Sequence, residues 1–544
     1  MAAEQFDADV LVVGAGPVGL ALATELTKRG HTVRVVEKND RTGVQPRAKT
    51  TNIRTMTHMR RWGLAGEMRE RSPLSPDFPR DVIFRTGLFD QPIYTFNDAF
   101  CATPRRYEAF PEHAEFIPQY VVEGILADHV AAEPLADLTF SCELIGFEQD
   151  QAGVSARLRD CRTGEERRIR TPFLVAADGG RSFVRDSLGI AMNGARNLVF
   201  CATLILRIPD LGDDPDLIKA LFHWIIDPQA PSFIGPMDRG DLWYWSKVAD
   251  RDVSTEELLA YARRAIGRDY PVEVVTRDDW IVHSLIADRY REARVFLAGD
   301  ACHLHSPFGG HGMNQGIGDA VDLGWKLSAV LEGWGSDGLF DSYTIERQQA
   351  HRAIVDSATK NVASLSDQFA DPDLMSDGPV GELARSKAAE AIARLKTPEF
   401  QSVGLVLGNS YAGSPAIADE PGPRGPIDIS HYVPSARPGH LAPHAWMDRQ
   451  TSLYDLFSDG FTLLRLGEAQ AGAEASLSAE ARDRAIPLDI VAPERPDLKA
   501  LYAANYALIR PDQQVAWRGH GLPAPDILLD VMTGRAEQSI RRTA

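Results

Sequence analysis

Three glycines near the start of the chain stand at the spacing of a dinucleotide-binding turn. Gly14, Gly16 and Gly19 follow a run of β-branched residues, with Pro17 between them, and Glu37 ends the next apolar run. Glycine at these positions permits a sharp turn, the approach of a pyrophosphate and close packing of a helix on a strand. The Glu37 carboxylate can accept hydrogen bonds from a ribose diol. The pattern therefore favours NAD or the adenosine half of FAD.

A second glycine-rich segment, much later in the chain, decides between those two cofactors. Asp300 follows a buried-strand run directly, and from there its carboxylate could bond a ribityl hydroxyl. The backbone amides of Gly312, Met313 and Asn314 would stand at the start of a helix, where they can stabilise negative charge. A reduced flavin carries such charge on its pyrimidine edge. The two segments together predict FAD.

The elements between these motifs must bring them together. Segments 9–13, 18–28 and 32–36 have the patterns of a strand, a helix and a strand, which form a βαβ unit. Two further buried-strand runs, 174–177 and 295–298, each stop at an acid, and helical periodicity follows the second. We expect a Rossmann-type parallel sheet with the motifs at one edge.

The rest of the chain divides by composition. Residues 198–290 carry alternating strand patterns and clustered aromatic side chains, which predicts a mainly antiparallel sheet inserted into the nucleotide-binding domain. Residues 341–400 have a largely helical pattern. Seven of the 29 residues from Pro415 to Pro443 are proline, which indicates an extended linker. Short strand patterns beyond it indicate a small α/β domain.

Composition excludes several classes of function. Lys and Arg total 58 against 76 Asp and Glu, and the resulting net charge of −18 disfavours nucleic acid or an anionic membrane as partner. The five cysteines are scattered without a CxxC pair, so neither a disulfide framework nor a zinc knuckle is expected. No signal peptide or bilayer-spanning run is indicated, so we expect a cytoplasmic protein.

With these motifs, the sequence resembles the single-component class A flavoprotein aromatic hydroxylases. The family's three fingerprints occur in order: the glycine turn at 14–19, the motif Asp178-Gly-Gly-Arg-Ser-Phe-Val-Arg185, and Ala298-Gly-Asp300 followed by Pro307 and Gly312-Met-Asn314. The resemblance covers about residues 7–365. The stretch from Tyr506 is similar to the thioredoxin-like domain of phenol- and polyketide-hydroxylating members. No cysteine follows Cys302, so that domain cannot perform thiol–disulfide exchange.

The resemblance implies an α/β architecture in five segments. Residues 1–197 and 291–365 would form the Rossmann-type FAD-binding domain, and 198–290 the inserted, mainly antiparallel substrate-binding sheet. Residues 366–439 would be a helical segment and a proline-rich linker, and 440–544 the thioredoxin-like domain. A homodimer is a further expectation.

The resemblance also implies roles for individual residues. Glu37 would contact the adenosine ribose, Arg47 the pyrophosphate region and Gln119 the flavin. Asp178 would serve both FAD and transiently bound NAD(P)H, and Pro307 would pack beside the ring at the substrate face. The full predicted cofactor-binding set is Gly14, Gly16, Pro17, Gly19, Glu37, Lys38, Arg47, Gln119, Leu144, Asp178, Asp300, Pro307, Gly312, Met313 and Asn314.

The implied reaction is aromatic hydroxylation. NAD(P)H would reduce FAD, the reduced flavin would add O2 as a C4a-hydroperoxide, and a phenolic or polyketide-like ring would accept the oxygen. The same fold could instead perform Baeyer–Villiger oxidation, epoxidation or oxidative decarboxylation, or serve as a non-catalytic flavin-binding scaffold. Trp224, Phe233, Tyr244 and Pro307 are the predicted substrate-lining residues.

No catalytic residue is assigned from the sequence. His223, His283, Tyr244 and Tyr290 could each deprotonate a phenol. Lys49 receives no acid–base role, although some relatives carry an acid or a histidine there.

Two further motifs give only weak support for a function. His303 and His305 could ligate a metal, but an isolated pair is a weak signal and no metal is predicted. Trp243-Tyr-Trp245 is similar to an element of flavin-dependent halogenases, yet Ser246-Lys247 replaces the Ile-Pro that continues that element.

Overall fold

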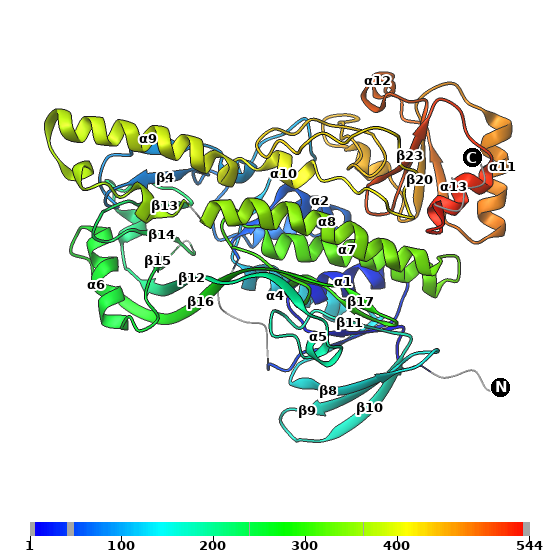
Figure 1. Cartoon of the computed structure of the whole chain (residues 1–544), viewed down its shortest axis with the longest axis horizontal. Helices are drawn as coiled ribbons and strands as arrows, with labels where there is room; N and C mark the ends of the chain where they lie inside the picture. The colour runs from blue at the N-terminus through cyan, green and yellow to red at the C-terminus, as the bar shows by residue number, and fades with distance from the viewer. Residues whose placement is uncertain (1–5, 41–47, 239, 363, 537–544) are drawn as a thin grey trace.

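A six-stranded sheet carries the glycine motif in the computed structural model, which describes residues 6–40, 48–238, 240–362 and 364–536 (Figure 1). The strand order is β17-β18-β11-β1-β2-β7, and every strand except β17 is parallel to its neighbours. This confirms the Rossmann-type sheet. Its strands are β1 (Val10–Val13), β2 (Val33–Val36), β7 (Ala136–Thr139), β11 (Phe173–Ala176), β17 (Arg291–Glu292) and β18 (Val295–Leu297).

Helices cover this sheet and leave its central strand without exposed residues. Helix α1 (Pro17–Lys28) begins at a proline, whose fixed φ suits a helix start. It packs against α4 (Gln119–Ala132) and α7 (Gly312–Leu331), and all four residues of β1 are buried. The predicted strand, helix and strand at 9–36 are confirmed to within one residue at each boundary.

Two small sheets extend the same core and were not predicted. An antiparallel sheet of β8 (Cys142–Gln149), β9 (Val154–Asp160) and β10 (Glu166–Thr171) lies at the bottom of Figure 1. A two-residue ladder joins β3 (Thr50–Thr51) to β6 (Glu115–Phe116). Short helices complete the region: α2 (Ile53–Arg61), α3 (Ala65–Glu70) and α5 (Phe183–Ser187).

The inserted sheet has eight strands in the order β19-β16-β12-β15-β14-β13-β4-β5. It is antiparallel except where β13 pairs with β4, which confirms a mainly antiparallel sheet. Three of its strands lie outside residues 198–290, because β4, β5 and β19 pair with it across long sequence separations. The strands are β4 (Val82–Arg85), β5 (Tyr94–Phe96), β12 (Met192–Arg207), β13 (Phe222–Ile225), β14 (Ser232–Pro236), β15 (Leu242–Val248), β16 (Glu273–Ala287) and β19 (His303–Leu304).

The two faces of this sheet differ in their neighbours. One face, with Trp243 and Trp245, packs in one apolar cluster with helix α6 (Thr255–Ile266). The opposite face presents Trp224, Phe233 and Tyr244. Strand alternation explains this division, because successive side chains point to opposite sides. The aromatic residues predicted to line the substrate pocket therefore share one face.

The last part of the chain is a small domain with a sheet of order β21-β20-β22-β23. Strands β20 and β21 are parallel and the other pairs antiparallel, as in a thioredoxin-like fold. Its elements are β20 (Phe461–Arg465), α11 (Ala471–Asp483), β21 (Leu488–Val491), α12 (Leu498–Tyr502), β22 (Tyr506–Ile509), β23 (Val515–Gly519) and α13 (Pro525–Met532). Strand β23 is the one strand of this sheet that was not predicted.

Two long helices lie in the chain between the substrate sheet and the C-terminal domain (Figure 1). They are α8 (Asp337–Val362) and α9 (Gly378–Phe400), in agreement with the helical pattern at 341–400, and the short helix α10 (Val403–Leu407) follows them. A shared apolar cluster joins Trp325 and Trp334 to Phe461 of the C-terminal domain. Within the described ranges, none of the helices is both long and apolar enough to cross a membrane.

Candidate active site

The glycine turn has the geometry that the motif predicts. Gly14 has φ +106°, and a Cβ there would lie 2.3 Å from the carbonyl oxygen of Ala177. A Cβ on Gly19 would lie 2.0 Å from the Gly14 oxygen. A Cβ on Gly16, by contrast, would meet no atom within 4 Å. The backbone at Gly16 is therefore open to a ligand at the start of α1, as a pyrophosphate requires.

Glu37 lies beside this turn, at the end of β2. Its carboxylate accepts hydrogen bonds from the Ala15 amide at 3.0 Å and the Asn39 amide at 2.9 Å. The side chain therefore links the end of β2 to the glycine turn. Lys38 is exposed next to it, and Arg47 lies outside the described residues.

The two acids that follow β11 and β18 are placed differently. Asp300 is exposed on a helical turn, Gly299–Ala301, directly after β18. Asp178 is half-buried, and one of its carboxylate oxygens accepts from the Val184 amide at 3.2 Å. The other oxygen is buried with no partner among the described residues, and burial raises the pKa of this carboxyl. An unsatisfied buried oxygen fits a donor supplied by a ligand.

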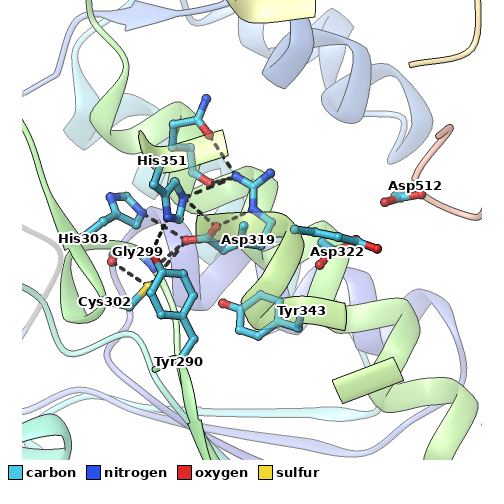
Figure 2. Close-up of polar contacts among 12 residues, drawn as sticks. Tyr290, Gly299, Cys302, His303, Asp319, Asp322, Tyr343, His351 and Asp512 are labelled. Atoms are coloured by element: carbon cyan, nitrogen blue, oxygen red, sulfur yellow. Dashed lines mark hydrogen bonds and ion pairs between the residues drawn. The ribbon is translucent and has the colours of Figure 1, made fainter. Parts of the chain in front are cut away.

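A buried polar network supports the turn that carries Asp300 (Figure 2). Asp319 accepts hydrogen bonds from the Gly299 amide at 2.9 Å and the Arg347 Nε at 2.7 Å, and lies 3.0 Å from nitrogens of both His303 and His351. His303 thus belongs to this network rather than standing free beside His305. Asp319 was not singled out from the sequence, because the motif ends before it.

The start of α7 is held by the side chain of Asn314. Its amide nitrogen donates to the carbonyls of Thr50 and Gly310, at 2.8 and 2.6 Å, and its oxygen accepts from the Asn52 amide at 2.9 Å. The amides of residues 312–314 belong to the first turn, so they precede the intrahelical ladder and can face a ligand. The Met313 side chain is buried.

Gln119 and Leu144 contribute less directly. The Gln119 amide donates to the Ala48 carbonyl at 2.7 Å, and its side chain donates to Glu123. This places Gln119 beside the segment that leads into β3. Leu144 is buried in the hydrophobic core, so its side chain is not available to a ligand.

The aromatic face approaches this site through Phe308. Its ring lies 6.1 Å from that of Trp224 and 6.3 Å from that of Phe233, measured between centroids. Pro307, immediately before it, is exposed. Phe233 lies 6.1 Å from Tyr244, so the rings form a continuous apolar surface.

The four residues considered as bases lie in different environments: His223, His283, Tyr244 and Tyr290. His223 faces away from this surface, and burial together with Arg85 lowers its pKa to about 3. His283 accepts from the Asn197 amide, and Tyr290 lies 2.6 Å from His351 within the Asp319 network. Tyr244 alone among the four lies on the aromatic face.

Two lysines near the aromatic face, the half-buried Lys49 and the fully buried Lys396, were given no role from the sequence. Lys49 lies over the Tyr244 ring, with 2.9 Å between Nζ and the ring centroid. Lys396 lies 4.2 Å from the Trp224 centroid and pairs with Glu399 at 2.7 Å. The sequence signal for Lys49 was its position, at which some relatives carry an acid or a histidine. Lys396 had none, since charges on a long helix usually face water.

An open glycine turn at the start of α1, an acid after β18 and a helix start beside an aromatic face are together the arrangement expected of a flavoprotein. Comparison with known proteins agrees. Residues 7–358 match the FAD binding domain family, and residues 435–536 match the family described as aromatic-ring hydroxylase, C-terminal. The chain belongs to the FAD-dependent aromatic-ring hydroxylases, which are monooxygenases.

Similar proteins match nearly the whole chain. A putative polyketide hydroxylase of Streptomyces halstedii is 32% identical over 94% of this chain and 93% of its own length. Aklavinone 12-hydroxylase DnrF of Streptomyces peucetius is 33% identical over 87% of this chain and 94% of its own. The solved structure of RebC with bound 7-carboxy-K252c has a TM-score of 0.89 and 35% identity, and covers 98% of this chain and 100% of that one.

Proposed function

We propose that this protein hydroxylates a polycyclic phenolic or polyketide-like aromatic compound, with FAD as cofactor and NAD(P)H and O2 as co-substrates. The observation that carries the proposal is the contact of Phe308 with Trp224 and Phe233, directly after Pro307 and close to the start of α7. Similar proteins that are named for polyketide and aklavinone hydroxylation support this class of substrate.

Different residues would bind different parts of FAD and the substrate. Gly16 and Glu37 would bind the pyrophosphate and the adenosine ribose, Asp300 the ribityl chain, and the amides of 312–314 the pyrimidine edge. When bound, FAD supplies hydride acceptance and oxygen activation, chemistry that amino-acid side chains lack. The aromatic face would orient the substrate ring and exclude water.

Turnover with an aromatic panel tests this proposal. Purified protein should contain FAD and should oxidise NAD(P)H faster when a hydroxylated anthraquinone or naphthoquinone is added. The product should gain one oxygen atom from 18O2. Asp300→Ala should hold less FAD and lose this stimulation. A flavoprotein whose NAD(P)H oxidation no aromatic compound stimulates would instead be a non-catalytic scaffold.

Product structure distinguishes the alternative reactions of this fold. Hydroxylation retains the carbon skeleton and yields a phenol, whereas Baeyer–Villiger oxidation inserts oxygen into a C–C bond and yields a lactone. Decarboxylation would be recognised by loss of CO2.

The expected homodimer and cytoplasmic location remain predictions, to be measured by light scattering and by cell fractionation.

A further inference from the structure

Lys49 lies between the two halves of the proposed active site. Its carbonyl accepts a hydrogen bond from the Ile117 amide at 2.7 Å, and the next residue, Thr50, accepts from Asn314 at the start of α7. Its side chain extends in the other direction, to Tyr244 on the aromatic face. The ammonium group therefore lies between the start of α7 and the aromatic face.

The surroundings of this ammonium group are unusual. Its Nζ lies 2.9 Å from the centroid of the Tyr244 ring, which is only 2% exposed. Lys49 is half-buried, and the partial loss of hydration beside Tyr244 lowers its pKa well below the ordinary value. Among the described residues, no carboxylate forms an ion pair with it.

Two fully buried lysines elsewhere in the chain provide an internal comparison. Lys326 lies 2.8 Å from carboxylates of both Asp322 and Glu346, and Lys396 lies 2.7 Å from Glu399. A buried cation normally needs such a partner, because a cation–π contact offsets only part of the lost hydration. Lys49 alone of the three has an aromatic ring in place of an anion.

We propose that Lys49 binds an oxyanion of the aromatic substrate, a carboxylate or a phenolate, and so selects substrates that are ionised next to the flavin. This inference rests on the proposed function and names the charge of the substrate, which the reaction class alone does not. The compound bound to RebC, 7-carboxy-K252c, carries a carboxyl group, which is compatible with this proposal.

Binding of matched anionic and neutral probes to the FAD-loaded enzyme tests the proposal. Anthraquinone-2-carboxylate and its carboxamide form the carboxylate pair, and alizarin and its dimethyl ether form the phenol pair. Dissociation constants are measured by calorimetry for the wild type, Lys49→Met and Lys49→Arg. Met keeps most of the side-chain length without the charge, while Arg keeps the charge.

Lys49→Met should weaken binding of at least one anionic probe about tenfold and leave its neutral partner within about twofold. Lys49→Arg should retain most of the preference. The pair that responds identifies a carboxylate or a phenolate as the recognised group. Tyr244→Phe, which keeps the ring, should leave the preference unchanged.

Three results would overturn the inference. Equal weakening of the anionic and neutral probes would show that Lys49 only supports the pocket. A preference lost in Tyr244→Phe but kept in Lys49→Met would assign recognition to the tyrosine hydroxyl. A large loss of FAD affinity in Lys49→Met with an unchanged preference would place the charge toward the cofactor. Failure of all four probes to bind the wild type would instead reject the proposed aromatic substrate class, and the inference with it.

Discussion

Lys396 and Glu399 form an ion pair inside the aromatic cluster, with Lys396 fully buried and Glu399 2% exposed. Burial lowers the pKa of Lys396 and raises that of Glu399, which shows that both charges have lost hydration. Each charge is tolerated because the other is present. Their i, i+3 spacing on α9 gave no hint of this position, since the same spacing is common on exposed helix faces.

Lys396→Met should destabilise the protein by about 3–5 kcal/mol, because Glu399 would remain buried without its partner. Replacing both residues, as Lys396→Met with Glu399→Leu, should recover most of this loss. Urea unfolding followed by tryptophan fluorescence measures both effects. A single variant as stable as the wild type would mean that water reaches Glu399.

At the scale of elements, the side chain of Glu25 links helix α1 to helix α2. Its fully buried carboxylate accepts from the Trp62 indole at 2.9 Å and pairs with Arg29 at 2.8 Å and with Arg61. Burial by itself would raise the pKa of Glu25, but Arg61 and Arg29 lower it to about 2. The helix behind the glycine turn is thus held to its neighbour by an ionised group.

This shift predicts a pH dependence of stability. Because the folded pKa of Glu25 is about 2 and its ordinary value 4.5, its contribution is complete above about pH 4.5. It should be lost as the pH falls toward 2, by about 3 kcal/mol in total. The free energy of unfolding of Glu25→Gln, measured between pH 3 and 6, should therefore fall less steeply than that of the wild type. Parallel curves would contradict the assignment.

The sequence pattern predicted the strands and the helix around the first glycine motif closely. It did not predict which strands pair when they lie far apart in the chain. β1, α1 and β2 follow one another within forty residues and carry clear periodicity. β4 and β5 join the substrate sheet only through β13, which lies far along the chain. The contact of Lys49 with Tyr244 depends on the same folding together of distant segments. The motifs therefore predicted the cofactor side of the site better than the substrate side.

At the scale of the whole molecule, the proline-rich segment indicated an extended linker before the C-terminal domain. The structure adds that this domain makes buried contacts with α7 and α8. Arg510, fully buried after β22, pairs with Asp322 of α7 at 2.9 Å and with Glu346 of α8 at 2.6 Å. Trp325 and Phe461 lie in the same apolar cluster across this boundary. The C-terminal domain is thus part of the structure that supports α7.

Arg510→Met should destabilise the protein by about 3–5 kcal/mol, because Asp322, Glu346 and Asp512 would stay buried and lose their ion pairs with Arg510. Arg484→Met, a change at an exposed position of the same domain, should cost less than about 0.5 kcal/mol. Thermal unfolding followed by both flavin release and tryptophan fluorescence should show one coupled transition in the wild type. Flavin release that is unaffected by Arg510→Met would favour independent domains.

Helix α7 begins at Gly312, has Asn314 in its first turn at the proposed flavin site, and extends past Trp325, in the cluster shared with the C-terminal domain. We therefore expect α7 and the C-terminal domain to evolve together. A recombinant with a C-terminal domain from another such enzyme should fold only if that domain supplies partners for Asp322 and Trp325. Natural chimaeras should accordingly have crossover points before α7 rather than within the proline-rich segment.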